Sequence, residues 1–184
     1  RPIASSEVAR NPGPFALDVE LAKTAPLTYL NAVFDGLRQA LGENKEFSWS
    51  SLIAQCATVF ERVSQLSTDE HAVVLKHSIG HFIWDGLQRN AALAPADREI
   101  AWDLLARLSE DPEPVSDDDY QDGSGWDIYT HSLNVTRGIA LNGVIAFAMK
   151  AWREAGDSWK DLDTVPGLRG LLDSHLHNDT SFAV

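Results

Sequence analysis

Six histidines are the residues of this chain with the most readily assigned chemistry, because two of them have metal-ligand spacing. His77 and His81 are four residues apart, so on a helix their imidazoles share a face and can reach one zinc ion. His175 and His177, in the segment HLHND, are candidates for further ligands. The general-base glutamate of the metalloprotease motif is missing from HSIGH. We therefore favour half-buried, hydrogen-bonded helix residues, and predict no cofactor.

A second polar group interrupts the apolar segment THSLNVTRGIALNGVIAFAMKAW, residues 130–152. Asn134, Gly138 and Asn142 follow one another at intervals of four residues, and Arg137 flanks this stripe. Gly138 would let a neighbouring helix approach closely. Arg137 at such an interface needs a carboxylate or carbonyl partner, because an unpaired buried charge is costly. We predict a polar clasp between helices, with a binding site for an anionic group centred on Arg137 as the alternative.

Other patterns of catalytic residues are weak. Cys56 falls on the apolar side of a helical pattern, so we predict that it packs in the core and is not a nucleophile. The segment GLRGLL lacks the lysine and hydroxyl residue of a phosphate-binding loop. In DDDYQDGSGWDIY, a calcium loop would place Tyr120 and Tyr129 where carboxylates are needed. No catalytic residue is predicted.

The charge of the chain limits its partners. It carries 27 acidic and 15 basic residues, a net charge of −12, and its lysines and arginines are scattered. Direct binding to nucleic acid is not expected, because phosphate contacts need clustered cations. The acids concentrate at 110–127, a segment with proline and glycine that we predict to be a solvated loop.

Helical spacing of apolar residues dominates the remaining sequence. Leu30, Val33, Phe34, Leu37 and Leu41 illustrate it, and Gly42 is placed to end that helix. The pattern predicts helices over 26–41, 48–66, 67–93, 94–111 and 130–152, with one or two shorter helices after residue 156. No stretch alternates apolar and polar residues over the length of a strand.

The predicted fold is therefore all-α, with antiparallel helices that form an α-solenoid-like (HEAT/ARM-like) arrangement or an irregular bundle. Residues 1–25 read as an irregular lead-in, and residues 26–184 as a single helical domain. No apolar run is long enough to cross a bilayer, so no membrane association is expected. A single cysteine fits a reducing cytoplasm. The chain begins at Arg1 without a leader, and we expect it to be processed or a piece of a larger protein.

The segment SLNVTRGIALNG resembles an Asn-x-x-Arg-Gly helix found in helical regions of very large bacterial proteins. FSWSSLIAQC is similar to their tryptophan-containing second helix, and AWDLLARLSEDPEP with its acidic continuation precedes the Asn-Arg-Gly helix in a similar order. HNDTSFAV resembles the start of a HEAT-type repeat. The resemblance covers roughly residues 26–184. Many such proteins carry an NTPase domain, and several are associated with anti-phage defence. The resemblance implies no catalytic residues in this segment.

These observations lead to one main expectation and two alternatives. The main expectation is a non-enzymatic helical scaffold or recognition segment of a large intracellular bacterial protein. Its partners would be other domains of the same parent protein or a separate protein. The first alternative is a small helical metal-binding or hydrolytic domain that uses His77 and His81. The second is an adaptor whose acidic loop docks a basic partner.

Overall fold

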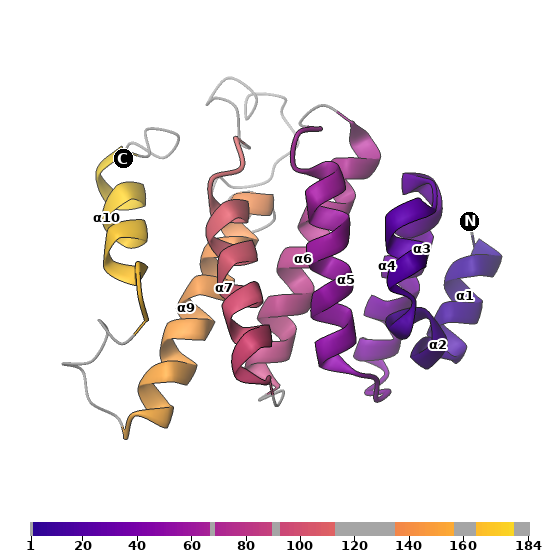
Figure 1. Ribbon diagram of the computed structural model, residues 1–184, viewed down its shortest axis with the longest axis horizontal. Coiled ribbons are helices and arrows are strands. Elements are labelled where there is room, and N and C mark those ends of the chain that lie inside the picture. Colours follow the sequence, from indigo (N-terminus) through magenta and orange to yellow (C-terminus); the bar gives the residue numbers. More distant parts are fainter. Residues whose placement is uncertain (1, 67–68, 90–92, 113–134, 157–164, 179–184) are drawn as a thin grey trace, which may run out of the picture.

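Helices account for every element of the computed structural model, which describes residues 2–66, 69–89, 93–112, 135–156 and 165–178. No strand occurs within these ranges. The all-α prediction is confirmed. The helices stand beside one another in a row that runs from α1 at one end to α10 at the other (Figure 1).

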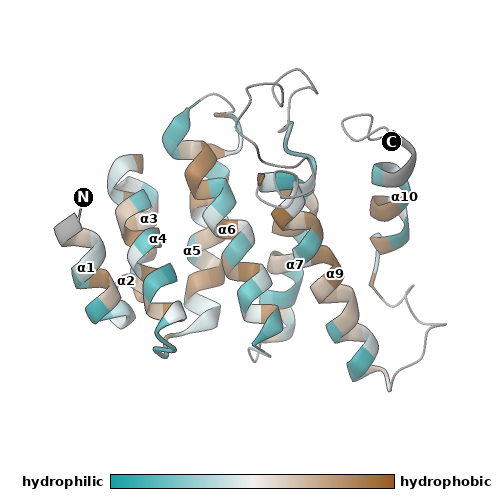
Figure 2. Cartoon of the chain, turned by 180° about the vertical axis from the view of Figure 1, so that it is seen from behind, coloured by the Kyte–Doolittle hydropathy of each residue, from teal (hydrophilic) through white to brown (hydrophobic). Residues whose placement is uncertain are grey.

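The helices expected from apolar spacing are present, and most of their ends agree within a few residues. Apolar side chains spaced three and four residues apart give each helix one buried side, and hydrophobic and hydrophilic residues accordingly alternate along the helices (Figure 2). Side chains that accept hydrogen bonds from backbone amides begin two of these helices, Ser48 for α5 and Asp69 for α6. The bounds are α4 (Leu27–Gly42), α5 (Trp49–Val63), α6 (Glu70–Gln88), α7 (Pro95–Ser109), α9 (Thr136–Glu154) and α10 (Leu168–Asn178).

The prediction of an irregular lead-in over residues 1–25 is wrong. This segment forms three short helices, α1 (Pro2–Arg10), α2 (Pro12–Leu17) and α3 (Val19–Thr24). The prolines that suggested irregular chain stand at helix starts, where a missing N–H costs nothing. Small buried side chains then hold these helices against the rest of the molecule: Ala9, Ala16 and Ala22.

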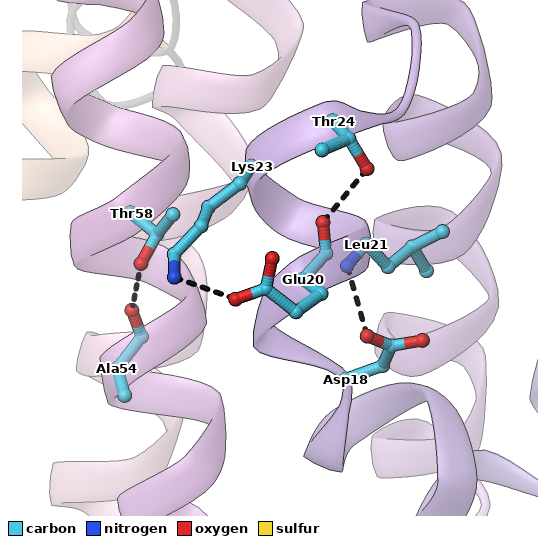
Figure 3. A network of polar contacts seen from close by, with 7 residues as sticks. All are labelled: Asp18, Glu20, Leu21, Lys23, Thr24, Ala54 and Thr58. Atoms are coloured by element: carbon cyan, nitrogen blue, oxygen red, sulfur yellow. Dashed lines mark hydrogen bonds and ion pairs between the residues drawn. The ribbon is translucent and has the colours of Figure 1, made fainter.

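Local hydrogen bonds stabilise α3 where it lies beside α5 (Figure 3). Asp18 precedes the helix and accepts a hydrogen bond from the backbone N–H of Leu21 at 2.8 Å. Lys23 and Glu20 form an ion pair one turn apart, and the hydroxyl of Thr24 donates to the carbonyl of Glu20. Side-chain caps of this kind contribute about 1 kcal/mol each. A six-residue helix is therefore maintained by its cap and by packing.

Two layers of helices follow from which elements touch. One layer contains α1, α4, α6 and α9, each packed on the next, and the other contains α3, α5 and α7 in the same way. Two packed layers of successive helices are the arrangement of an α-solenoid as well as of a bundle. The predicted fold class, which allowed for both, is therefore consistent with this architecture.

The core lies between the two layers, and aromatic and aliphatic side chains fill it. Phe34 of α4 and Phe82 of α6 meet edge to face with ring centroids 5.5 Å apart, and both are almost fully buried. Cys56 is completely buried on α5, and burial raises the pKa of its thiol. It is therefore a packing residue, as the sequence predicts.

Glycines permit the closest helix contacts. A Cβ on Gly36 of α4 would lie 2.5 Å from the backbone oxygen of Ser5 and 2.6 Å from the Cβ of Val8, so α1 can rest there only because residue 36 has no side chain. A methyl carbon of Leu105 on α7 occupies the position that a Cβ on Gly143 of α9 would need. The two glycines therefore let α1 approach α4 and α7 approach α9 closely. The sequence did not predict a close approach at either position.

The end of α4 differs from its prediction in one detail. Gly42 is its last helical residue, but the residue with positive φ is Asn44, at 58°. Its N–H donates to the carbonyl of Leu41, and the N–H of Lys45 donates to the carbonyl of Ala40. This is the Schellman pattern, in which asparagine can replace glycine.

Candidate functional site

The outward side of α6 carries a line of partly exposed side chains that we call the α6 strip. Its opposite side is buried, through residues such as Leu75, Ile79 and Phe82. Residues three and four positions apart share a side of a helix. A second series with this spacing therefore faces away from the buried side. The α6 strip consists of Glu70, Val74, His77, His81, Trp84 and Gln88.

Three aromatic rings are in contact along the middle of the strip. The imidazoles of His77 and His81 meet edge to face with centroids 4.8 Å apart, and His81 stacks on Trp84 at 5.8 Å. The predicted shared face of His77 and His81 is confirmed. The two contacts join the three rings into one aromatic line along the strip.

The charge state of the strip is set by its surroundings. Partial burial, together with the nearby charges of Arg38 and His77, lowers the pKa of His81 to about 4. Burial raises the pKa of Asp85, against the opposing effects of Arg89 and Arg38. At neutral pH the His81 ring is therefore uncharged, and Arg38 of α4 lies close enough to act on both groups.

Of the other candidate metal ligands, His175 is not grouped with this pair. His175 is placed on α10, where its Nε2 lies 3.2 Å from the hydroxyl of Ser109 and 4.0 Å from a carboxylate oxygen of Glu110. The side chain of His177 lies outside the description. Among the described residues, no three His, Cys, Asp or Glu side chains are grouped so that they could hold a metal ion. What the structure brings together is two histidines and a tryptophan.

A hollow of about 530 Å³, which we call the N-terminal hollow, lies beside the first half of the strip. Its walls come from α1, α4 and α6. Ser5 donates a hydrogen bond to Asp35 at 2.6 Å, and the side-chain nitrogen of Asn31 lies 3.1 Å from Nδ1 of His71. With Asp35 and Glu70 in its described lining, this hollow is acidic.

A second hollow, of about 410 Å³, lies beside the other half of the strip, and we call it the α6–α9 hollow. Trp84 forms part of its α6 wall. Its α9 wall includes Ile145 and Met149, whose side chains are among the exposed large hydrophobic ones, at 54 % and 36 %. Two cations, Lys150 and Arg153, complete that wall. The α6–α9 hollow therefore combines two cations with exposed apolar side chains. The strip and the two hollows together form one surface of the α1–α4–α6–α9 layer, which we call the recognition surface.

The predicted clasp residues have varied placements. Asn134 lies outside the described residues. Arg137 and Gly138 are partly exposed in the first turn of α9, and Asn142 lines the α6–α9 hollow. Close approaches of α9 to its neighbours are found at Gly143 and at Gly80 of α6, where a Cβ would lie 3.0 Å from a methyl carbon of Ile139. The interhelical clasp itself stays a prediction.

An ion pair that the sequence analysis missed links α6 to the chain just after α7. Nζ of Lys76 lies 2.6 Å from Oδ2 of Asp111, with both side chains about 95 % buried, at 4 % and 5 % exposure. Asp111 belongs to the segment predicted to be a solvated acidic loop, and that prediction is wrong for this residue. The signal was available, because Lys76 falls on the apolar side of its helix with Ala72, Ile79 and Ile83. The segment from residue 113 to 127 lies outside the described residues.

Comparison of this chain with protein-family models, curated proteins and solved structures found no match. The candidate site thus rests on the geometry of the chain itself. None of the described helices has the length and apolar character needed to cross a bilayer.

Proposed function

We propose that this chain is a non-enzymatic recognition segment, and that its recognition surface binds another polypeptide. The partner is either another domain of the same parent protein or a separate protein. The surface combines an aromatic line with two hollows on either side of it. Hollows of this size are within the range of about 300–1,000 Å³ that is typical of ligand sites.

The observation that carries the proposal is the exposure of large apolar side chains at both hollows. Val74 is 46 % exposed beside the N-terminal hollow, and Ile145 and Met149 are exposed at the other. Trp84, in the α6 wall of the α6–α9 hollow, is partly exposed. Exposed apolar and aromatic side chains surrounded by polar groups are characteristic of protein-binding surfaces.

The wider setting of the proposal comes from the sequence. The Asn-x-x-Arg-Gly resemblance supports a place in a large cytoplasmic bacterial protein that has an NTPase domain and acts in phage defence. The two-layered helical arrangement supports a solenoid, in which a row of helices offers one extended surface to a partner. In that setting the NTPase portion performs the chemistry, and this segment selects or positions the partner.

The alternative function is a metal site at His77 and His81. The contact of their rings supports it, and so does the low pKa of His81, because a metal ligand must be an uncharged imidazole. A stable zinc site needs four ligands, of which at least three come from the protein.

Selection from a displayed library of random peptides tests the proposal. Peptides that bind the wild type are assayed against the double variant Val74→Asp/Ile145→Asp, which places charges at both hollows. The matched control is Leu17→Asp/Leu66→Asp, because these residues are also exposed, at 62 % and 40 %, but neither lines the two hollows. Both variants add the same charge.

We expect the selected peptides to bind the wild type and the control equally and to lose at least tenfold in affinity for the Val74→Asp/Ile145→Asp variant. If no peptide is enriched, or if the enriched peptides bind both variants alike, the proposed function is wrong. Circular dichroism spectra establish that both variants remain helical.

A further inference from the structure

The α6–α9 hollow differs from the surrounding protein in the sign of its charge. Lys150 and Arg153 line it, and no carboxylate belongs to its described lining, although acids outnumber bases by 27 to 15 in the whole chain. A carboxylate oxygen of Glu154 lies 3.8 Å from Nζ of Lys150. That carboxylate is already bonded to the two terminal nitrogens of Arg98, at 2.7 and 3.2 Å. Positive charge therefore remains at the hollow.

Apolar side chains lie directly beside these cations. Ile145, the most exposed large hydrophobic residue of α9, follows one turn after Asn142 and precedes Met149 by one turn. Trp84, from α6, lines the same hollow. A ligand that fits here needs one bulky apolar group and negative charge within a few ångströms of it.

We propose that the α6–α9 hollow binds an acidic peptide segment of a partner protein, with an apolar side chain against Trp84, Ile145 and Met149 and carboxylates at Lys150 and Arg153. This inference rests on the proposed function and specifies its partner. Carboxylates pair with arginine and lysine through charge-assisted hydrogen bonds. The amides of Gln88 and Asn142, which also line the hollow, are able to bond the peptide backbone.

A peptide fits better than a nucleic acid. Two cations cannot offset the repulsion between a polyphosphate and a chain of net charge −12, whereas a short peptide presents its carboxylates only where the cations are. The apolar part of the hollow likewise matches an aliphatic or aromatic side chain. The acidic N-terminal hollow does not match this ligand, so binding at one end of the recognition surface is expected.

Fluorescence anisotropy with three labelled peptides tests the inference. The first peptide has glutamates on both sides of a central Leu-Phe pair. The second has glutamines in place of the glutamates, and the third has serines in place of the Leu-Phe pair. An oligonucleotide of deoxythymidines with the same charge as the first peptide is measured alongside them.

We expect the first peptide to bind at least tenfold more tightly than each of the other two and than the oligonucleotide. Arg153→Glu should weaken its binding about tenfold. Arg10→Glu is the matched control, since Arg10 is exposed on α1, remote in the row from α9, and the charge change is identical. Lys150→Gln, which changes the charge less, should weaken binding severalfold.

Equal weakening by Arg10→Glu and Arg153→Glu would show that only the overall charge matters and would overturn the inference. Equal binding of the glutamine peptide, tighter binding of the oligonucleotide, or no binding of the first peptide would overturn it too. The library selection distinguishes a failure of the acidic-peptide inference from a failure of the proposed function. Selected peptides that need Val74 and Ile145 but lack acids would leave the proposed function in place.

Discussion

The ammonium group of Lys76 on α6 and the carboxylate of Asp111, two residues after the end of α7, form an ion pair with an N–O distance of 2.6 Å. Both side chains are almost completely buried, so each group has exchanged its hydration for the other. Removing one partner leaves an uncompensated charge in the interior, which is far more costly than the loss of an exposed pair. This pair therefore fixes the chain after α7 against α6, the helix that carries the α6 strip.

The variant Lys76→Met should lower the free energy of unfolding by about 3–5 kcal/mol, because Asp111 stays buried without its partner. The double variant Lys76→Met/Asp111→Leu should recover much of that loss. Lys23→Met is the control, since Lys23 forms an exposed pair with Glu20 and should cost about 1 kcal/mol or less. Urea unfolding measures all three. A Lys76→Met variant as stable as the wild type would refute the importance of the pair.

Gly36→Ala should destabilise the protein by about 1–3 kcal/mol, because the new Cβ would overlap the backbone of Ser5 and the side chain of Val8. The control is Gly42→Ala in the same helix, where no atom lies within 4 Å of an added Cβ. That change should be neutral or stabilise by up to about 1 kcal/mol. Thermal unfolding compares the two. If both variants melt alike, α1 is not held against α4 as described.

Acidification should destabilise the protein through His81. Its pKa is about 4 in the folded chain, below the value of about 6.5 expected when unfolded. The unfolded state thus binds the proton more readily, and stability that is present above about pH 6.5 is lost progressively as the pH falls towards 4.

The test of this pH dependence is the variant His81→Phe, which keeps an aromatic ring against Trp84. The wild type should lose more stability than this variant between pH 7 and pH 4.5, in urea unfolding at each pH. An NMR titration of the wild type should find the His81 imidazole still uncharged at pH 5.5. A measured His81 pKa near 6.5 would contradict the account of its surroundings.

Zinc analysis separates the recognition segment from the metal-binding alternative. The two imidazoles of His77 and His81 offer too few ligands for tight binding, so we expect dialysed protein to retain well below one equivalent of zinc. Elemental analysis of the wild type and of His77→Ala provides the measurement. One equivalent in the wild type that disappears in His77→Ala would establish the metal site instead.

Much of the fold could be predicted from local pattern alone. The spacing of residues such as Leu30, Phe34 and Leu37 defined α4, and similar spacing defined α5 to α7 and α9. The N-terminal helices were missed because residues 1–14 are rich in proline, serine and glycine, a composition typical of irregular chain. Pro2 and Pro12 nevertheless stand in the first turns of α1 and α2, where proline is compatible with a helix. Local signals thus fail where short helices are stabilised by tertiary packing.

The candidate site was less predictable, because it depends on contacts between distant segments. The spacing of His77 and His81 showed that they share a face, but not that Trp84 continues it or that Arg38 of α4 lies nearby. The sequence likewise did not show that Ile145 of α9 lies exposed at the α6–α9 hollow. Such information appears only when helices are placed beside one another.

Chemical-shift mapping of a selected peptide on the isotope-labelled chain tests the recognition surface most directly. We expect the amide signals perturbed by the peptide to belong to α1, α4, α6 and α9, with the largest changes near Trp84 and Ile145, while α3, α5 and α7 are unaffected. Perturbations centred on α5 and α7, or spread evenly over both layers, would contradict this expectation.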